Sequence, residues 1–268
     1  MKQAQTSLQA NLAHSDDARF DALCLAEHAF GFNHTQLRLR TDQLVDPSEY
    51  FKLIARRAAG EPLQYILGEW EFYGLRFAVG PGVLIPRPET EMLVDIALQS
   101  QVAMGNAQWN VVDLCAGSGC VGLSVAHHLP HAQVHLVELS DQAMPYLCKN
   151  AASYPNVKVH HADIFNCALR IAHYELILAN PPYIPTAEIA GLAREVQREP
   201  VLAQDGGADG LDFYRGIAQH WLPRLSPGGM LVVECGDGQA QQIAALFGGK
   251  TEILQDFNGI DRIVAAKR

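Results

Sequence analysis

The sequence predicts an α/β protein whose mostly parallel, doubly wound sheet is preceded by a small helical domain and a β-hairpin linker. Between residues 89 and 268, short aliphatic runs alternate with helical stretches, an order typical of a parallel sheet covered on both faces. Before residue 70, apolar residues instead recur at helical spacing. We therefore expect a helical domain over 1–70, a hairpin linker over 71–88 and a sheet domain over 89–268.

The helical pattern of the first domain has two clear parts. Apolar side chains fall at helical spacing from residue 20 to residue 30, and Gly31 stands where a C-terminal cap is expected. A further helix begins at Pro47 and continues to residue 60. From residue 68 onward, alternating residues between turn glycines predict the hairpin that links the domains.

The sheet domain is expected to place its chemistry at one edge. The expected strands are Val111–Leu114, Val134–Glu138, Val157–His161, Leu176–Ala179, Met230–Glu234, Ile253–Phe257 and Arg262–Ala266. The expected helices are Val121–Leu129, Gln142–Ala151, Gly210–Leu225 and Gln239–Leu246. Ligands of such sheets bind at the carboxyl ends of the strands, so the site is expected in the loops that follow them.

Composition and spacing exclude several classes of partner. The 268-residue chain has 20 Lys and Arg against 29 Asp and Glu, a formal net charge of −9. Binding to nucleic acid through general phosphate neutralisation needs clustered basic charge, so no nucleic-acid partner is expected. The six cysteines form no CxxC pair and the eleven histidines no HExxH pattern, so no metal site is expected. The sequence has neither the apolar core of a signal peptide nor an apolar stretch approaching a length of roughly 18 residues, so we expect a cytoplasmic chain with no membrane partner.

A glycine-rich loop follows the first expected strand of the sheet domain. Gly117, Gly119 and Gly122 form a GxGxxG pattern between a strand and a helix. Glu138 ends the next strand, where its carboxylate is placed to accept hydrogen bonds from a ribose. These residues fit a dinucleotide site and the nucleoside pocket of an S-adenosylmethionine-dependent methyltransferase equally well.

Two acidic residues favour the methyltransferase. Asp113 precedes the glycine loop, where a carboxylate repels a pyrophosphate but attracts a sulfonium or ammonium group. Asp163 follows the third expected strand and is a candidate acceptor for the adenine amino group; its alternative role is to cap the turn that it begins.

The fourth expected strand ends in Asn180, followed by Pro181, Pro182 and Tyr183. The prolines have no N–H, so this segment offers acceptors: the Asn180 side-chain oxygen and the Pro181 carbonyl. A planar NH2 group can donate one hydrogen to each acceptor while Tyr183 covers its face. We therefore expect methylation of such a nitrogen, with Asn180, Pro181 and Tyr183 as catalytic residues. The acceptors stabilise the positive charge that develops on nitrogen, so neither a metal nor an enzyme nucleophile is needed.

Several segments resemble the PrmC (HemK) family of peptide chain release factor glutamine methyltransferases, and together they cover nearly the whole chain. They are residues 55–91 with the signature LIPRPETE, the segment NPPYIP, residues 198–217, LSPGGMLVVECGDGQ and the terminal FNGIDRIV. The resemblance implies a class I S-adenosylmethionine-dependent methyltransferase with a seven-stranded sheet, in which residues 1–70 recognise the substrate. It also implies methylation of the side-chain amide nitrogen (N5) of the glutamine in the Gly-Gly-Gln motif of release factors, the proteins of translation termination.

The residues and the resemblance together define the expected site. The expected cofactor-binding residues are Asp113, Cys115, Ala116, Gly117, Ser118, Gly119, Glu138, Asp163, Ile164 and Asn180. The expected substrate-binding residues are Asn180, Pro181, Pro182, Tyr183 and Arg87. Glu199 and Pro200 are expected to brace the active-site loop. The chain departs from the family where Cys115-Ala116 replaces a common Gly-Thr and where Glu138 replaces a common Asp, and both departures bear on cofactor geometry.

Other functions that share parts of this pattern stay open. Ribosomal-protein glutamine methyltransferases share NPPY but usually differ in the IPRPETE segment, and adenine-N6 methyltransferases of nucleic acids use the same site. An NAD-dependent oxidoreductase rests on GxGxxG and Glu138 and leaves NPPY unexplained. A non-catalytic binding module is disfavoured because NPPY and the acidic positions are intact. The expected enzyme is a monomer with release factors as its protein partners.

Overall fold

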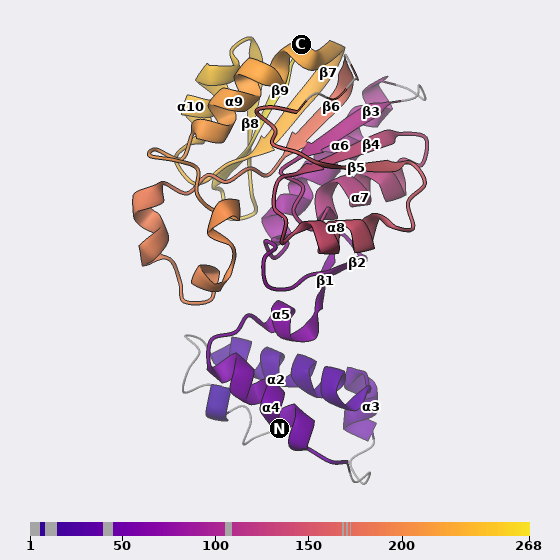
Figure 1. Ribbon diagram of the computed structural model, residues 1–268, viewed down its shortest axis with the longest axis vertical. Helices are drawn as coiled ribbons and strands as arrows, with labels where there is room; N and C mark the ends of the chain where they lie inside the picture. The colour runs from indigo at the N-terminus through magenta and orange to yellow at the C-terminus, as the bar shows by residue number, and fades with distance from the viewer. Residues whose placement is uncertain are drawn as a thin grey trace. The chain divides into compact units, whose positions relative to one another are not determined.

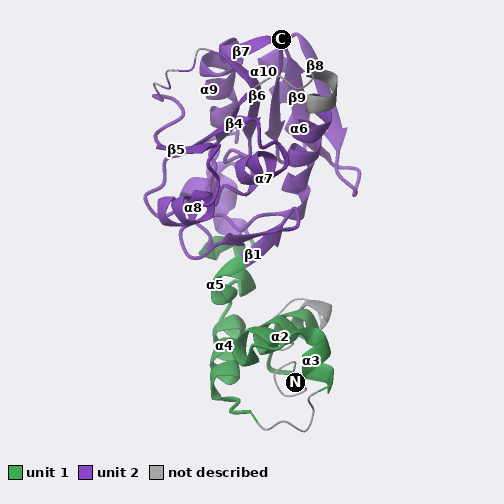
Figure 2. Cartoon of the chain, turned by 90° about the vertical axis from the view of Figure 1, so that its right-hand side faces the viewer, with its two compact units in different colours: residues 1–69, 193–198 green, residues 70–192, 199–268 purple. Residues whose placement is uncertain are grey.

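The computed structural model describes residues 6–8, 15–39, 45–104, 109–167, 169, 171 and 173–268. The chain forms two compact units (Figure 2): one contains Met1–Glu69 and Ala193–Arg198, the other Trp70–Leu192 and Glu199–Arg268. Residues 1–5 and 9–14, which hold most of the N-terminal stretch judged above to lack signal-peptide character, lie outside the described residues. Across the described part of the chain, every helix falls short of the length and hydropathy that a membrane crossing requires.

The smaller unit is helical. Its described helices are α2 (Ser15–Phe30), α3 (His34–Leu39), α4 (Ser48–Ala58) and α5 (Leu63–Leu67). The helices predicted over 20–30 and 47–60 are confirmed as α2 and α4, and Gly31 after α2 has the positive φ, +65°, of a C-terminal cap. Helices α3 and α5 were not predicted, because five or six residues are too few to show helical periodicity.

A buried ion pair holds the smaller unit together. The Arg57 guanidinium on α4 is only 4% exposed, and its Nε donates to Oδ2 of Asp21 on α2 at 2.6 Å. Its Nη2 donates to Oε1 of Glu195 at 2.7 Å. Glu195 lies in the segment Ala193–Arg198, so this contact ties that segment to α4.

The predicted hairpin is present as a separate two-stranded sheet of β1 (Glu69–Phe72) and β2 (Leu75–Ala78). Tyr73 and Gly74 between them have φ of +52° and +71°, the positive values that a type I′ turn requires at both central positions. The Tyr73 N–H donates to Oε1 of Glu91 at 2.7 Å, which holds the turn against the start of the following helix.

The larger unit is built on a seven-stranded sheet (Figure 1). Its strands are β3 (Asn110–Leu114), β4 (Gln133–Glu138), β5 (Val157–His161), β6 (Tyr174–Ala179), β7 (Leu225–Glu234), β8 (Lys250–Gln255) and β9 (Asp261–Lys267). The order is β5-β4-β3-β6-β7-β9-β8, with β9 antiparallel to both neighbours and all other pairs parallel. This confirms the class I methyltransferase architecture, and the direction of strand order reverses between β3 and β6.

Helices cover both faces of this sheet, as the alternation of strands and helices predicts. They are α6 (Glu91–Met104), α7 (Cys120–His128), α8 (Met144–Ala151), α9 (Asp212–His220) and α10 (Ala240–Phe247). Alternate residues of β3 show the division: Val111 packs in the core with α6, α7 and α8, and Val112 packs in the core with α9 and α10. Fully buried parallel strands of this kind have nearly continuous apolar sequences.

Two expected element ends were wrong, and one helix was not predicted. The helix predicted over 210–225 ends at His220, and Leu225 already belongs to β7. The strand predicted over 253–257 ends at Gln255, because the Asp256 carboxylate accepts the N–H groups of Asn258 and Ile260 and forms a turn. Helix α6 was not predicted, since its sequence is apolar on most sides and has little amphipathic pattern.

Candidate active site

A cavity open to solvent lies at the carboxyl ends of the strands where the strand order reverses. Most of the residues predicted for the site line it: Arg87, Asp113, Cys115, Ala116, Gly117, Ser118, Glu138, Asp163, Ile164, Asn180 and Pro182. Three other predicted residues are not among the described residues that line it: Gly119, Pro181 and Tyr183. The loops after β3, β4, β5 and β6, which are separate in the sequence, therefore converge as expected.

The glycine loop turns tightly between β3 and α7. Gly117 and Gly119 have φ of +56° and +82°, and a Cβ on Gly119 would lie 2.6 Å from Cδ1 of Leu147. Gly119 therefore shapes the loop from behind the cavity wall. Cys115 also has a positive φ, +59°, at the position where the family resemblance leads us to expect glycine. A non-glycine residue in this conformation carries backbone strain of about 1–2 kcal/mol, so having Cys instead of Gly at position 115 has an energetic cost.

The Cys115 thiol is not a candidate nucleophile. Burial raises its pKa well above the usual value, and the nearby carboxylates of Glu138, Asp113 and Asp163 raise it further. Because the thiolate is the reactive form, this side chain acts through packing.

Glu138 is fixed by two backbone donors. Its Oε2 accepts the Gly117 N–H and its Oε1 accepts the Ser140 N–H, both at 2.7 Å. Each oxygen retains a second acceptor position. The carboxylate at the end of β4 is thus oriented before any ligand binds, which suits two hydroxyls of a ribose.

Asp113 is almost fully buried and tied to the start of α7. Its Oδ2 accepts the Gly122 N–H at 2.8 Å, and burial raises its pKa to about 7. A Cβ on Gly122 would lie 2.2 Å from Cδ2 of Leu136 and 3.0 Å from Oδ2 of Asp113. The third glycine of the GxGxxG pattern therefore permits close packing of α7 on the sheet.

The position of Asp163 is compatible with both of the roles considered for it in the sequence. It lines the cavity, and its Oδ1 also accepts the Phe165 N–H at 2.9 Å, closing a local turn. Among the described residues lining the cavity, Arg87 is the one Lys or Arg beside three acids. This balance fits a cationic ligand and disfavours a pyrophosphate, so the residues present suit S-adenosylmethionine better than a dinucleotide.

Asn180 follows β6 and faces the same cavity. Its Nδ2 donates to Oγ1 of Thr90 at 3.1 Å. This bond uses the donor end of the amide, so Oδ1 is the end left to accept a hydrogen from a ligand. Pro181 and Pro182 are buried. The geometry therefore matches an acceptor site for an NH2 group.

Whether Tyr183 covers the substrate, as expected, stays a prediction. It is outside the cavity lining, and burial raises the pKa of its phenol to about 12. Its carbonyl accepts from Nε2 of Gln239 at 2.9 Å, and the Gly206 N–H donates to the carbonyl of the next residue, Ile184, at 2.9 Å. A Cβ on Gly206 would lie 2.7 Å from the Tyr183 Cα, and one on Gly210 would lie 2.3 Å from its carbonyl oxygen. These glycines let the loop brace the NPPY segment.

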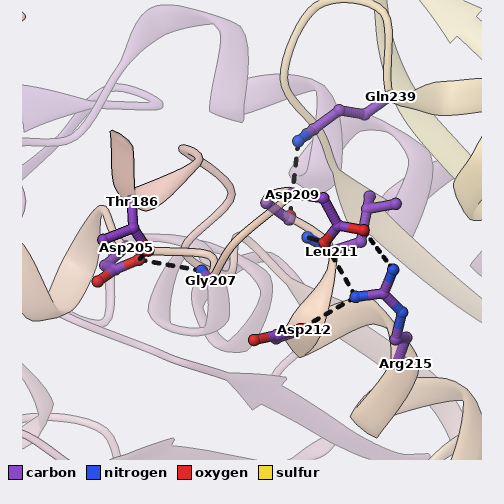
Figure 3. Close-up of polar contacts among 9 residues, drawn as sticks. Thr186, Asp205, Gly207, Asp209, Leu211, Asp212, Arg215 and Gln239 are labelled. Atoms are coloured by element: carbon purple, nitrogen blue, oxygen red, sulfur yellow. Dashed lines mark hydrogen bonds and ion pairs between the residues drawn. The ribbon is translucent and has the colours of Figure 1, made fainter. Parts of the chain in front are cut away.

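Side chains hold this bracing loop in shape (Figure 3). Oδ1 of Asp205 accepts the Thr186 hydroxyl at 2.6 Å and the Gly207 N–H at 3.0 Å. Nη1 of Arg215 on α9 donates to Oδ1 of Asp209 at 2.9 Å. The segment DGGADG thus connects the strand-end loop to α9, a connection that its turn residues suggest only in part.

Arg87 meets a buried acid. It forms an ion pair with Oε1 of Glu199, whose side chain is 2% exposed, and Oε2 of Glu199 accepts the Ile85 N–H at 3.0 Å. The Arg87 side chain is 35% exposed and lines the cavity. Glu199 thus braces the IPRPET segment, and whether Arg87 touches a substrate stays a prediction.

Two buried residues at the site were missed in the sequence. Thr90 and Glu234 are each 2% exposed, and the Thr90 hydroxyl oxygen accepts the hydrogen bond from the Asn180 amide. Glu234 ends β7 as Glu138 ends β4, so an acid at the end of an apolar strand was the signal that could have found it.

Comparison with known proteins identifies the family. A family model described as the PrmC N-terminal domain matches residues 2–68, and one described as the methyltransferase small domain matches residues 90–198. A release factor glutamine methyltransferase of Geobacter sulfurreducens is 42% identical over 94% of this chain and 90% of its own length. One of Thermodesulfovibrio yellowstonii is 41% identical over 81% of this chain and 80% of its own.

A solved structure supports the fold alone. The hMettl16 catalytic domain, solved in complex with a MAT2A 3′UTR hairpin, has a TM-score of 0.57 at 17% identity, covering 80% of this chain and 81% of that one. The sequence relatives carry the closer assignment, because their identity extends through both units. The chain belongs to the release factor glutamine methyltransferase family.

Proposed function

We propose that this chain transfers a methyl group from S-adenosylmethionine to the side-chain amide nitrogen (N5) of the glutamine in the Gly-Gly-Gln motif of peptide chain release factors. The relatives named above support the substrate class. The observation that carries the chemistry is the Asn180 amide, whose donor end is used by Thr90 and whose oxygen remains for the substrate.

The acidic wall of the cavity supports the cofactor. Asp113, Glu138 and Asp163 would hold the cofactor's cationic and hydroxyl groups, with the glycine loop against it. When bound, S-adenosylmethionine supplies a methyl group that is already activated on a sulfonium. The protein then needs to align two reactants and place charge, which is worth several orders of magnitude in rate.

The NPPY segment would prepare the nucleophile. An amide nitrogen is a poor nucleophile because its lone pair is delocalised into the carbonyl. The Asn180 oxygen, which faces the cavity, would accept one of its hydrogens. The Pro181 carbonyl is proposed as the second acceptor, although Pro181 is not among the described residues that line the cavity. Two such acceptors orient the lone pair and stabilise the positive charge that forms on the nitrogen. Tyr183 would cover one face of the planar amide group.

The proposal assigns recognition of the release factor to residues 1–70. The smaller unit has a groove lined by Leu23, Phe30, Tyr50 and Phe51, with Arg38 beside it. Phe51 is 40% exposed, so Phe51→Ser changes the groove with little loss of core. We expect it to raise KM for the release factor without changing KM for the cofactor; an unchanged KM for the release factor would contradict the assignment.

Site mapping by mass spectrometry tests the reaction itself. The full chain is incubated with S-adenosylmethionine and a release factor, with a second release factor whose Gly-Gly-Gln glutamine is replaced as control. One added methyl on that glutamine, absent from the control, is expected. Methylation that persists in the control, or appears on a ribosomal protein or on adenine instead, contradicts the substrate. We also propose that the enzyme is a monomer and that it acts in the cytoplasm. Light scattering of the purified chain measures the oligomeric state.

A further inference from the structure

A second depression, here called the flanking groove, adjoins the active-site cavity in the larger unit. Its side chains come from the loop after β5, the segment after Pro200 and the start of α9. The apolar and acidic ones are Phe165, Val201, Leu202, Phe213, Asp205 and Asp212. Leu202 and Phe213 also line the cavity, so the two depressions are continuous. A substrate with one side chain in the cavity can therefore place a nearby side chain in the flanking groove.

The apolar wall of the flanking groove is open to solvent. Val201 and Leu202, in the short turn Val201–Ala203, are 54% and 52% exposed. Phe165 and Phe213 pack against each other, with ring centroids 5.4 Å apart. Gly216 on α9 makes room for Phe165, because a Cβ on this glycine would overlap Cε1 of the ring. Exposed apolar side chains gathered beside a ligand cavity are typical of a surface that a partner covers.

The rim of the flanking groove is acidic. Asp205 and Asp212 both lie beside Gly207 (Figure 3): Oδ1 of Asp205 accepts the Gly207 N–H at 3.0 Å, and a Cβ on Gly207 would overlap Oδ2 of Asp212. Arg215 pairs with Asp212 and also with Asp209, so one cation faces several acids. The described residues that line the groove include no Lys or Arg. The groove therefore favours an uncharged or cationic side chain over an acidic one.

The proposed substrate motif decides which side chain can reach this groove. The two residues before the methylated glutamine are glycines, which have no side chain, so the nearest side chains lie on its C-terminal side. Along an extended segment, alternate side chains point to the same face and stand about 7 Å apart. The residue two positions after the glutamine therefore points in the same direction as the glutamine itself.

We propose that the flanking groove binds the side chain two positions after the methylated glutamine of the release factor and selects an apolar side chain there. The inference rests on the proposed function, because it takes the Gly-Gly-Gln glutamine as the residue in the cavity. The apolar side chain would cover Val201 and Leu202, and the two aspartates of the rim would repel an acidic one. The groove thus distinguishes this glutamine from other exposed glutamines by the sequence that follows it.

Steady-state methylation of a release factor by the full chain tests the enzyme side of the groove. Val201→Ser changes a residue that lines the flanking groove and is not among the described residues that line the cavity. We expect it to lower kcat/KM for the release factor about tenfold, while Kd for S-adenosylmethionine stays within about twofold of the wild-type value. Leu246→Ser is the matched control: this aliphatic side chain on α10 is 37% exposed, and its loss should leave both quantities unchanged.

Variants of the release factor give the decisive comparison. The residue two positions after the glutamine is made Leu, Ser or Asp, and the residue three positions before the glutamine is changed in the same way as a control. With the wild-type enzyme, kcat/KM should fall from Leu to Ser to Asp. With Val201→Ser, the difference between Leu and Ser should shrink to about twofold. Changes three positions before the glutamine should have little effect.

Three results would overturn the assignment of the groove while methylation itself persists. They are equal kcat/KM for the Leu, Ser and Asp variants, a fall of the same size with Val201→Ser as with the wild type, and a larger effect of the residue before the glycines. A wild-type enzyme that methylates no release factor would instead overturn the proposed function, and this inference with it.

Discussion

Glu138 allows a quantitative test of the cofactor site. Its two oxygens accept the N–H groups of Gly117 and Ser140 at 2.7 Å, and each has one acceptor position left for a ribose hydroxyl. In Glu138→Gln, one oxygen becomes an NH2 group that faces a backbone donor. A hydrogen bond to a charged group contributes about 1.5–3 kcal/mol, and each 1.4 kcal/mol is a factor of ten. We therefore expect Kd for S-adenosylmethionine to rise between about 10-fold and about 150-fold.

Isothermal titration of the full chain measures this Kd directly, with Glu138→Asp as the matched variant. Asp keeps the charge on a side chain one methylene shorter, so its Kd should stay within about tenfold of the wild type. A Kd for Glu138→Gln within twofold of the wild-type value, at unchanged thermal stability, would refute the assignment of Glu138 to the cofactor.

Three further predictions concern packing, ion pairing and pH. Gly206→Ala places a Cβ 2.7 Å from the Tyr183 Cα, so it should lower the free energy of unfolding by about 1–3 kcal/mol and should also lower kcat. In the control Gly191→Ala the new Cβ has nothing within 4 Å, so neither quantity should change. Thermal unfolding and turnover measurements check this. Asp21→Asn leaves the buried Arg57 poorly compensated and should cost about 3 kcal/mol in denaturant unfolding, against less than about 0.5 kcal/mol for the exposed Lys52→Ala; equal costs would contradict the role of burial. Burial raises the pKa of Asp113 from 3.8 to about 7, so the stability tied to its protonated form is full below about pH 4 and is lost as pH rises toward 7. The Tm of cofactor-free Asp113→Asn relative to wild type should therefore increase between about pH 5 and about pH 8, and a constant difference would count against it.

The architecture and most of the cavity were predictable because local patterns carry them. Buried parallel strands are apolar throughout and end in polar residues, so Asp113, Glu138 and Asn180 stand out at the strand ends. Because ligands bind at the carboxyl ends of such strands, the convergence of these loops on one site can be predicted from the sequence alone. The residues of the glycine loop and NPPY were found for the same reason.

The missed features depend on contacts between distant segments. Thr90 matters because its hydroxyl oxygen accepts from the Asn180 amide, and no local pattern in the sequence reveals that neighbourhood. The backbone contacts of Tyr183 are a second example: its carbonyl accepts from Gln239, and Gly206 approaches its Cα closely. Helix α6 lacked a clear amphipathic face, so periodicity could not detect it.

The central claim is that the Asn180 oxygen accepts a hydrogen from the nitrogen to be methylated. The most direct measurement compares Asn180→Ala with the wild type in single-turnover methylation of a release factor and in cofactor titration. Losing this acceptor should lower the rate by about 100-fold or more while Kd for S-adenosylmethionine changes little. A rate that falls only in proportion to lost cofactor binding, or that stays near the wild-type rate, would contradict the acceptor role.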